Sequence, residues 1–125
     1  MILVDTSVWV DHLRSDNKVL AGLLDVGAIL AHPFVVGELA LGNLRRRAVV
    51  LGALSDLPQA IVATDAEVLA FIDRHGLFGC GIGYVDAHLL AAVRLTTGSE
   101  LWTADKRLHG TAHRMGVAFQ PQHVA

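Results

Sequence analysis

Short apolar runs alternate with longer amphipathic stretches along the 125-residue chain, and this pattern predicts strands that alternate with helices. The apolar runs expected to form buried strands are 2–4, 28–30, 60–62, 101–103 and 117–119. One helix follows the cluster Asp5–Ser7, and the other helices are expected over about 17–26, 33–41, 45–54, 64–74, 84–96 and 105–115. Pro33 and the capping-box pattern Thr64–Glu67 mark two of the helix starts. We therefore predict one α/β domain over residues 1–125, in which a parallel sheet is flanked by helices on both faces.

The composition supports a sheet that is covered by helices. Hydrophobic residues make up 53% of the chain and charged residues only 18%, as expected when strands are buried on both faces. The single cysteine, Cys80, cannot form an intramolecular disulfide and fits a reducing compartment. No apolar stretch approaches the roughly 18 residues of a membrane span, and the first apolar run is too short for a signal peptide. We expect a soluble, cytoplasmic protein with no membrane association.

Four carboxylates lie where a parallel sheet places its ligands, beyond the carboxyl ends of the strands. Asp5 directly follows the first strand, and Asp105 lies just past the strand at 101–103. Asp86 occupies the first turn of its predicted helix, and Glu38 lies within the first two turns of another. We expect all four side chains to point to one edge of the sheet.

Carboxylates gathered in this way would need a cation. Two of them ~4 Å apart repel by roughly 4 kcal/mol at an effective dielectric constant of ~20, and without a cation one would tend to hold a proton. Hard oxygen ligands suit Mg²⁺, with Mn²⁺ as a plausible substitute. The reaction class that follows is hydrolysis of a phosphodiester by a metal-activated water.

Each carboxylate also has a structural explanation. Asp105 could be only a helix N-cap, and Asp86 could be placed to favour the helix dipole. Glu38 shares a mainly apolar helical face with residues such as Leu41, and a carboxylate buried there would need a partner. Asp5 gives the strongest indication of a functional site, because it directly follows an apolar strand and precedes two hydroxyl-bearing residues. The four together favour a functional site over four coincidences.

Hydroxyl and basic side chains lie near these carboxylates in the sequence. Thr6, Ser7 and Thr103 could orient metal ligands or contact phosphate, although Thr6 and Ser7 could equally cap a helix. The basic candidates for contacts with a nucleic-acid backbone are Arg45, Arg46, Arg47, Lys106 and Arg107. A solvated helix surface is an equally good explanation for them. The net charge of −2 argues mildly against a nucleic-acid binder, but setting four metal-bound carboxylates aside leaves +2.

The ordered acidic blocks resemble those of PIN-domain ribonucleases, and more specifically the VapC toxins of prokaryotic toxin–antitoxin pairs. The similarity rests on residues 4–9 (Val-Asp-Thr-Ser-Val-Trp), on the helix that contains Glu38, on 83–87 (Gly-Tyr-Val-Asp-Ala) and on 101–105 (Leu-Trp-Thr-Ala-Asp). It covers essentially the whole chain, in the family's order.

The resemblance implies a PIN-like fold and Mg²⁺- or Mn²⁺-dependent endonucleolytic cleavage of RNA. It also implies a homodimer and inhibition by a cognate VapB-type antitoxin, whose C-terminal segment covers the acidic site. The positions that match the family's acidic quartet are Asp5, Glu38, Asp86 and Asp105. Those that match its associated hydroxyls are Thr6, Ser7 and Thr103.

Three other classes compete with this interpretation. A haloacid dehalogenase-like phosphatase needs a second aspartate two residues after the first, where this chain has Ser7. A receiver-like signalling domain needs an aspartate at the end of a central strand, but the predicted third strand leads into Val62-Ala63-Thr64. A module with this fold that binds RNA or protein without cutting stays open, although the complete quartet argues against it.

Overall fold

Three short parallel strands form the centre of the computed structural model, which describes residues 1–121. They are β1 (Ile2–Val4), β2 (Ile29–Leu30) and β3 (Glu100–Trp102), in the order β2-β1-β3. β1 is therefore the middle strand, and its last residue, Val4, pairs with Trp102. Consequently, the residues that follow β1 and β3 leave the sheet side by side.

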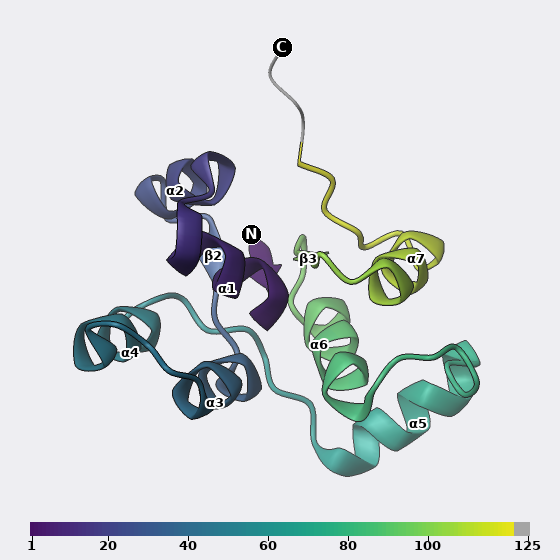
Figure 1. Cartoon of the computed structure of the whole chain (residues 1–125). Helices are drawn as coiled ribbons and strands as arrows, with labels where there is room; N and C mark the ends of the chain where they lie inside the picture. The colour runs from purple at the N-terminus through teal and green to yellow at the C-terminus, as the bar shows by residue number, and fades with distance from the viewer. Residues whose placement is uncertain (122–125) are drawn as a thin grey trace.

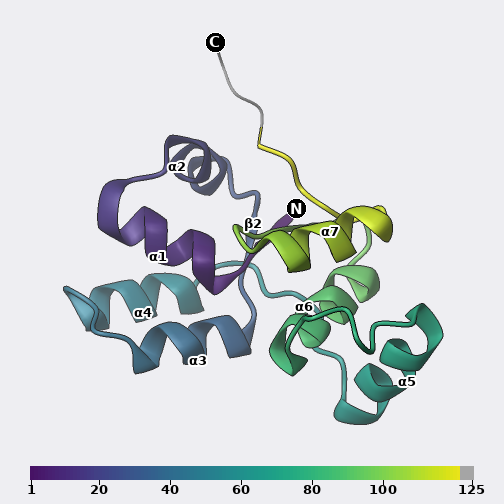
Figure 2. The same ribbon diagram turned by 45° about the vertical axis from the view of Figure 1, so that its right-hand side comes forward.

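Within residues 1–121, seven helices surround this sheet (Figures 1 and 2). Their bounds are Thr6–Ser15 (α1), Lys18–Asp25 (α2), Pro33–Leu41 (α3), Arg47–Ser55 (α4), Asp65–His75 (α5), Tyr84–Leu95 (α6) and Lys106–Arg114 (α7). Contacts join α1 to α3, α3 to α4 and α5 to α6, while α6 and α7 pack against β3. The predicted α/β fold, a parallel sheet flanked by helices, is confirmed. No helix within residues 1–121 is long and apolar enough to cross a membrane.

Most helix starts follow from local sequence. Pro33 occupies the first turn of α3, and Thr64 and Glu67 form the predicted capping box of α5. The helix expected from residue 45 begins instead at Arg47, because Arg46 adopts a left-handed conformation with φ of 54°. A left-handed residue cannot continue a right-handed helix, so the helix starts after it.

The strand predicted at 60–62 is wrong. Within residues 1–121 the only pairing with the sheet here is an isolated bridge just before the segment, between Ala31 and Gln59, next to a backbone hydrogen bond that Ala60 donates to Ala31 at 2.9 Å. The backbone N–H of Ile61 donates to the Thr96 hydroxyl at 3.0 Å instead of to a neighbouring strand. The side chains of Ile61 and Val62 are also 53% and 46% exposed, so only Ala60 of this apolar run enters the core.

The strand predicted at 117–119 is also reduced to a single bridge, between Ala118 and Leu101. Two backbone hydrogen bonds support the bridge: Leu101 donates to Val117 at 2.7 Å, and Phe119 donates to Leu101 at 2.9 Å. The pairing has the expected parallel direction, but it is too short to form a strand of its own. The ordered sheet therefore has three strands where the sequence predicted five.

A buried histidine, His32, caps α3. Its side chain is fully buried, and its Nδ1 accepts a hydrogen bond from the backbone N–H of Phe34 at 3.0 Å. Burial, and secondarily the nearby His88, lowers the pKa of His32 from 6.5 to about 4. His32 is therefore neutral around neutral pH.

This lowered pKa predicts a pH-dependent stability. Between pH 4 and 6.5 the unfolded chain binds a proton at His32 that the folded chain does not, so stability falls as pH falls through this window. The contribution is at most about 3 kcal/mol. Urea unfolding across the window should give a steeper pH dependence for the wild type than for His32→Asn, which keeps a capping side chain. Parallel curves for the two proteins would contradict the prediction.

Candidate active site

Asp5 lies at the junction between β1 and α1, where it is both the helix N-cap and a buried carboxylate. Its Oδ1 accepts hydrogen bonds from the Ser7 hydroxyl and from the backbone N–H of Ser7 at 2.8 Å. Its Oδ2 accepts a hydrogen bond from the Thr103 hydroxyl. The capping role and the predicted site role are thus compatible, and both carboxylate oxygens have a fixed direction.

The two hydroxyls that hold Asp5 also join β1 to β3. Ser7 Oγ accepts from the backbone N–H of Ala104, and Thr103 Oγ1 accepts from that of Asp105, both at 3.0 Å. Each hydroxyl has one proton, and in both cases it is donated to Asp5. The structure therefore brings the predicted residues Ser7 and Thr103 against Asp5 and ties Asp105 to them.

Asp105 is the N-cap of α7, and its Oδ1 accepts from the backbone N–H of Leu108 at 2.9 Å. The sequence-based expectation that Asp105 is a helix N-cap is thus confirmed. It does not compete with a role in the site, because a carboxylate has two oxygens and several lone pairs.

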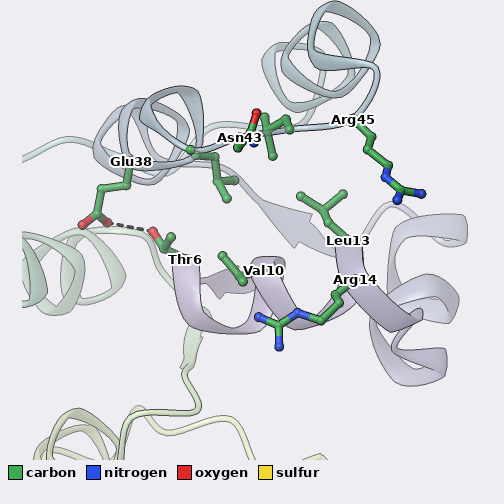
Figure 3. Close-up of a pocket in the computed structure, with 10 residues that line it drawn as sticks. Thr6, Val10, Leu13, Arg14, Glu38, Asn43 and Arg45 are labelled. Atoms are coloured by element: carbon green, nitrogen blue, oxygen red, sulfur yellow. Dashed lines mark hydrogen bonds between the residues drawn. The ribbon is translucent and has the colours of Figure 1, made fainter.

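Glu38 projects from α3 towards the start of α1, where the Thr6 hydroxyl donates to its Oε1 at 2.7 Å (Figure 3). The expectation that Glu38 shares a buried apolar face is wrong, because Glu38 is exposed and Leu41 is 91% exposed. A partner is nevertheless present. Thr6 therefore positions a third carboxylate, and it links α1 to α3.

Asp86 provides the electrostatic evidence that the four carboxylates converge. It is half-buried in the first turn of α6, and its Oδ2 accepts from the backbone N–H of Gly83 at 3.1 Å. Burial raises the pKa of Asp86 above its ordinary 3.8, and the negative charges of Asp5, Asp105 and Glu38 raise it further, while the Gly83 hydrogen bond opposes them. Asp86 thus lies within electrostatic reach of the three other carboxylates, which come from different elements.

This acidic site fits a hard divalent cation. Within residues 1–121 no lysine or arginine forms an ion pair with any of the four carboxylates, so nothing in that part of the chain neutralises them directly. No three acidic, histidine or cysteine side chains among the same residues stand close enough together to hold an ion by themselves. Mg²⁺ suits such a site, since it keeps several waters and takes few protein ligands.

The basic residues predicted to contact nucleic acid have different surroundings. Arg47 donates to the backbone carbonyl of Ala40 near the end of α3 at 2.6 Å, which is a structural role. Arg45 and Arg46 are exposed in the segment between α3 and α4. At the start of α7 the two basic residues, Lys106 and Arg107, are exposed as well.

A cavity of about 520 Å³ continues from the Thr6–Glu38 pair along α1 (Figure 3). Val10 and Leu13 of α1 line it, with Arg14 and Arg45 among its polar residues. Sequence analysis missed Arg14. Its spacing of four residues from Val10 puts both on one helix face, but nothing local shows that this face borders the acidic site.

The PIN domain family model matches residues 2–114. The chain belongs to the PIN domain family. This agrees with the resemblance found in the acidic blocks, and it sets aside the phosphatase and receiver folds. In this PIN domain, Asp5 and Asp105 follow neighbouring strands at their carboxyl ends.

The chain is similar to curated and solved PIN-domain relatives along most of its length. It is 49% identical to the protein named Ribonuclease VapC32 in two strains of Mycobacterium tuberculosis, over 94% of this chain and 95% of the relative. The crystal structure of FitAcB from Neisseria gonorrhoeae has a TM-score of 0.61 at 22% identity and covers 99% of this chain and 100% of that one. PAE2754 from Pyrobaculum aerophilum has a TM-score of 0.58 at 18% identity, with coverages of 88% and 78%. At these identities the two structures show the fold alone.

Proposed function

We propose that this PIN-domain protein is the toxin of a type II toxin–antitoxin pair and an endoribonuclease that depends on Mg²⁺ or Mn²⁺. The observation that carries the proposal is the geometry at Asp5, whose carboxylate is held by the Ser7 and Thr103 hydroxyls beside Asp105. Burial and then the charges of Asp5, Asp105 and Glu38 raise the pKa of Asp86, which supports a place for it in the same site. The 49% identity to a ribonuclease of the VapC type supports RNA as the substrate.

Each carboxylate has a part in this proposal. Asp5 is held rigidly by Ser7 and Thr103, so that it presents a fixed charge to the site. Asp86, Asp105 and Glu38 would complete the site, in part through waters that the ion keeps. Bound there, Mg²⁺ or Mn²⁺ would activate a water for attack on the phosphodiester and neutralise charge on the phosphate.

Basic side chains at the rim would attract the RNA backbone. We assign this role to Arg45, Arg46, Lys106 and Arg107, which are exposed and whose side chains make no hydrogen bond to the rest of residues 1–121. Arg47 is a weaker candidate, because its guanidinium already binds Ala40. Contacts of this kind give affinity without sequence selectivity.

The test is digestion of an end-labelled RNA in Mn²⁺ and in EDTA. Cleavage should require the metal and leave linear phosphate ends. Because water is the attacking group, cleavage should also persist when the 2′-hydroxyl at the cut is replaced by 2′-O-methyl. Metal-independent cutting, or cyclic phosphate ends, would contradict the proposal. RNA binding without cleavage in Mn²⁺ would favour the non-cutting module.

The cavity beside Glu38 is where we expect the VapB-type antitoxin to bind. Val10 and Leu13 are partly exposed there, and Arg14 and Arg45 are positively charged, so a segment with apolar and acidic side chains would fit. A segment in this cavity would extend over Thr6 and Glu38 and block the acidic site.

Leu13→Asp should therefore weaken inhibition by the antitoxin at least about tenfold, because it places a charge on an apolar contact. Cleavage of RNA by the free toxin should stay unchanged. The matched control is Val49→Asp, which puts the same charge on an exposed valine of α4 outside the cavity. Titration of each variant with antitoxin, read as residual cleavage, measures the effect. Equal inhibition of both variants would place the antitoxin elsewhere.

The homodimer implied by the family belongs to the same proposal. We expect light scattering on the toxin without antitoxin to give twice the mass of one chain. A monomer across the working concentrations would remove the dimer from the proposal and leave the active site, which one chain supplies, intact.

A further inference from the structure

Two buried histidines connect the helix that carries Glu38 with the helix that carries Asp86. His32 caps α3, and His88 lies on α6, two residues after Asp86. Both are essentially inaccessible, at 0% and 1% exposure. In Figures 1 and 2, α6 lies between α3 and α5. A buried polar group normally needs a hydrogen-bond partner, so the unpaired ring nitrogens of these histidines require an explanation.

The hydrogen bonds of His32 fix its tautomer. Its Nδ1 accepts from the backbone N–H of Phe34, so Nδ1 carries no proton. In the neutral imidazole the proton is then on Nε2. This Nε2–H is buried and has no partner among the described residues. His32 therefore presents an unused donor to the interior.

His88 presents the complementary group. Its Nε2 lies 3.1 Å from Asp65 Oδ1, which also accepts from the Tyr84 hydroxyl at 2.8 Å. These hydrogen bonds, first that of Tyr84 and then that of His88, lower the pKa of Asp65, so its carboxylate is an acceptor only. Nε2 of His88 is thus the donor, and in the neutral ring Nδ1 is an acceptor. That Nδ1 is also buried and without a partner.

The two rings pack around the same aromatic side chain. The ring centroid of Phe34 lies 5.1 Å from that of His32 and 4.6 Å from that of His88. His88 is also close enough to His32 to contribute to the lowered pKa of His32. An unused buried donor on His32 and an unused buried acceptor on His88 thus belong to two rings that pack against the same side chain, Phe34.

We propose that one buried water bridges His32 Nε2–H and His88 Nδ1, and that this bridge positions α3 against α6 and so sets the placement of Glu38 relative to Asp86. A water with two or more polar partners is a normal structural element of a protein interior. The bridge completes a chain from the cap of α3 through His88 to Asp65 and Tyr84, at the first residues of α5 and α6. His32 and His88 are positioning residues in this proposal. The consequence for Glu38 and Asp86 rests on the proposed metal site, whereas the bridge does not.

The bridge is tested by NMR of ¹⁵N-labelled, metal-free wild type at pH 8. Both histidines should carry the proton on Nε2, and His32 Nε2–H should exchange slowly and show a cross-peak to a long-lived water. His12 is an internal control, because its Nδ1 also accepts a backbone N–H (that of Asn17, at 2.9 Å), but its ring is only partly buried. Its Nε2–H should exchange rapidly. A proton on Nδ1 of His32, or exchange as fast as that of His12, would overturn the bridge.

The positioning role is tested by Mn²⁺ affinity in folded variants. His32→Asn keeps the cap on Phe34 but removes the Nε2–H, and His88→Gln keeps a donor for Asp65 but removes the ring acceptor Nδ1. Each single substitution should raise the Kd for Mn²⁺ about threefold or more. Because both substitutions break the same water bridge, the Kd of the double variant should be no higher than that of the weaker-binding single variant. Wild-type affinity in both single variants would overturn the positioning role. A wild type that binds no Mn²⁺ would contradict the proposed function, while the NMR result would still decide the bridge.

Discussion

The Asp5→Asn variant should lose metal-dependent RNA cleavage by about a thousandfold or more. Both oxygens of Asp5 accept hydroxyl protons, and an asparagine can accept at only one of them. The substitution thus removes a charge from the ion site and breaks one of the bonds that orient it. Single-turnover cleavage of a labelled RNA in Mn²⁺ measures the loss.

The control for this variant is Asp11→Asn, which removes the same charge from the exposed side of α1. It should cleave RNA like the wild type. If folded Asp5→Asn protein cleaves RNA at a rate within about tenfold of that of Asp11→Asn, Asp5 is not part of the mechanism.

The second large effect is expected for Thr103→Val, which replaces a buried hydroxyl by a methyl of similar size. Thr103 donates to Asp5 and accepts from the backbone N–H of Asp105, so one change leaves both groups without that partner. Cleavage should fall about 10- to 100-fold, as for other groups that orient metal ligands. The free energy of unfolding should fall by about 1–3 kcal/mol, because buried polar groups lose their hydrogen bonds.

Thr103→Ser separates the hydroxyl from the shape of the side chain. It keeps the oxygen and should restore most of the cleavage, and urea unfolding should show a smaller loss than for Thr103→Val. If the two variants cleave RNA equally slowly, the hydroxyl of Thr103 does not orient Asp5.

The fold was predictable where a local pattern decides it. The apolar runs that became β1 and β3, the proline at the start of α3 and the Thr64–Glu67 capping box are all visible in the sequence. The segments 60–62 and 117–119 have the same apolar character, but among the described residues 117–119 makes one bridge and the bridge nearest to 60–62 is at Gln59. Strand formation depends on a partner distant in the sequence, and apolar character alone does not show how far a pairing extends.

The candidate site was predictable in outline but not in its contacts. Asp5 and Asp105 follow strands in the sequence, so their common edge could be inferred from topology. The hydrogen bonds between Thr103 and Asp5, and between Ser7 and Ala104, join residues that are 98 and 97 positions apart in the sequence. Glu38 was misjudged, because helical spacing does not tell whether a neighbour such as Leu41 is covered. The burial of His32 and His88 has no local signal either.

The measurement that tests the acidic site most directly is Mn²⁺ binding by electron paramagnetic resonance in wild type and in Asp86→Asn. An asparagine can keep the hydrogen bond from Gly83 while it removes the charge that the other three carboxylates repel. The wild type should bind Mn²⁺ at millimolar concentrations or below, and Asp86→Asn should bind it at least about tenfold more weakly. Asp73→Asn, which changes an exposed carboxylate on α5, should behave like the wild type. Equal binding by wild type and Asp86→Asn, or no binding by either, would contradict a divalent-metal site built from Asp5, Glu38, Asp86 and Asp105.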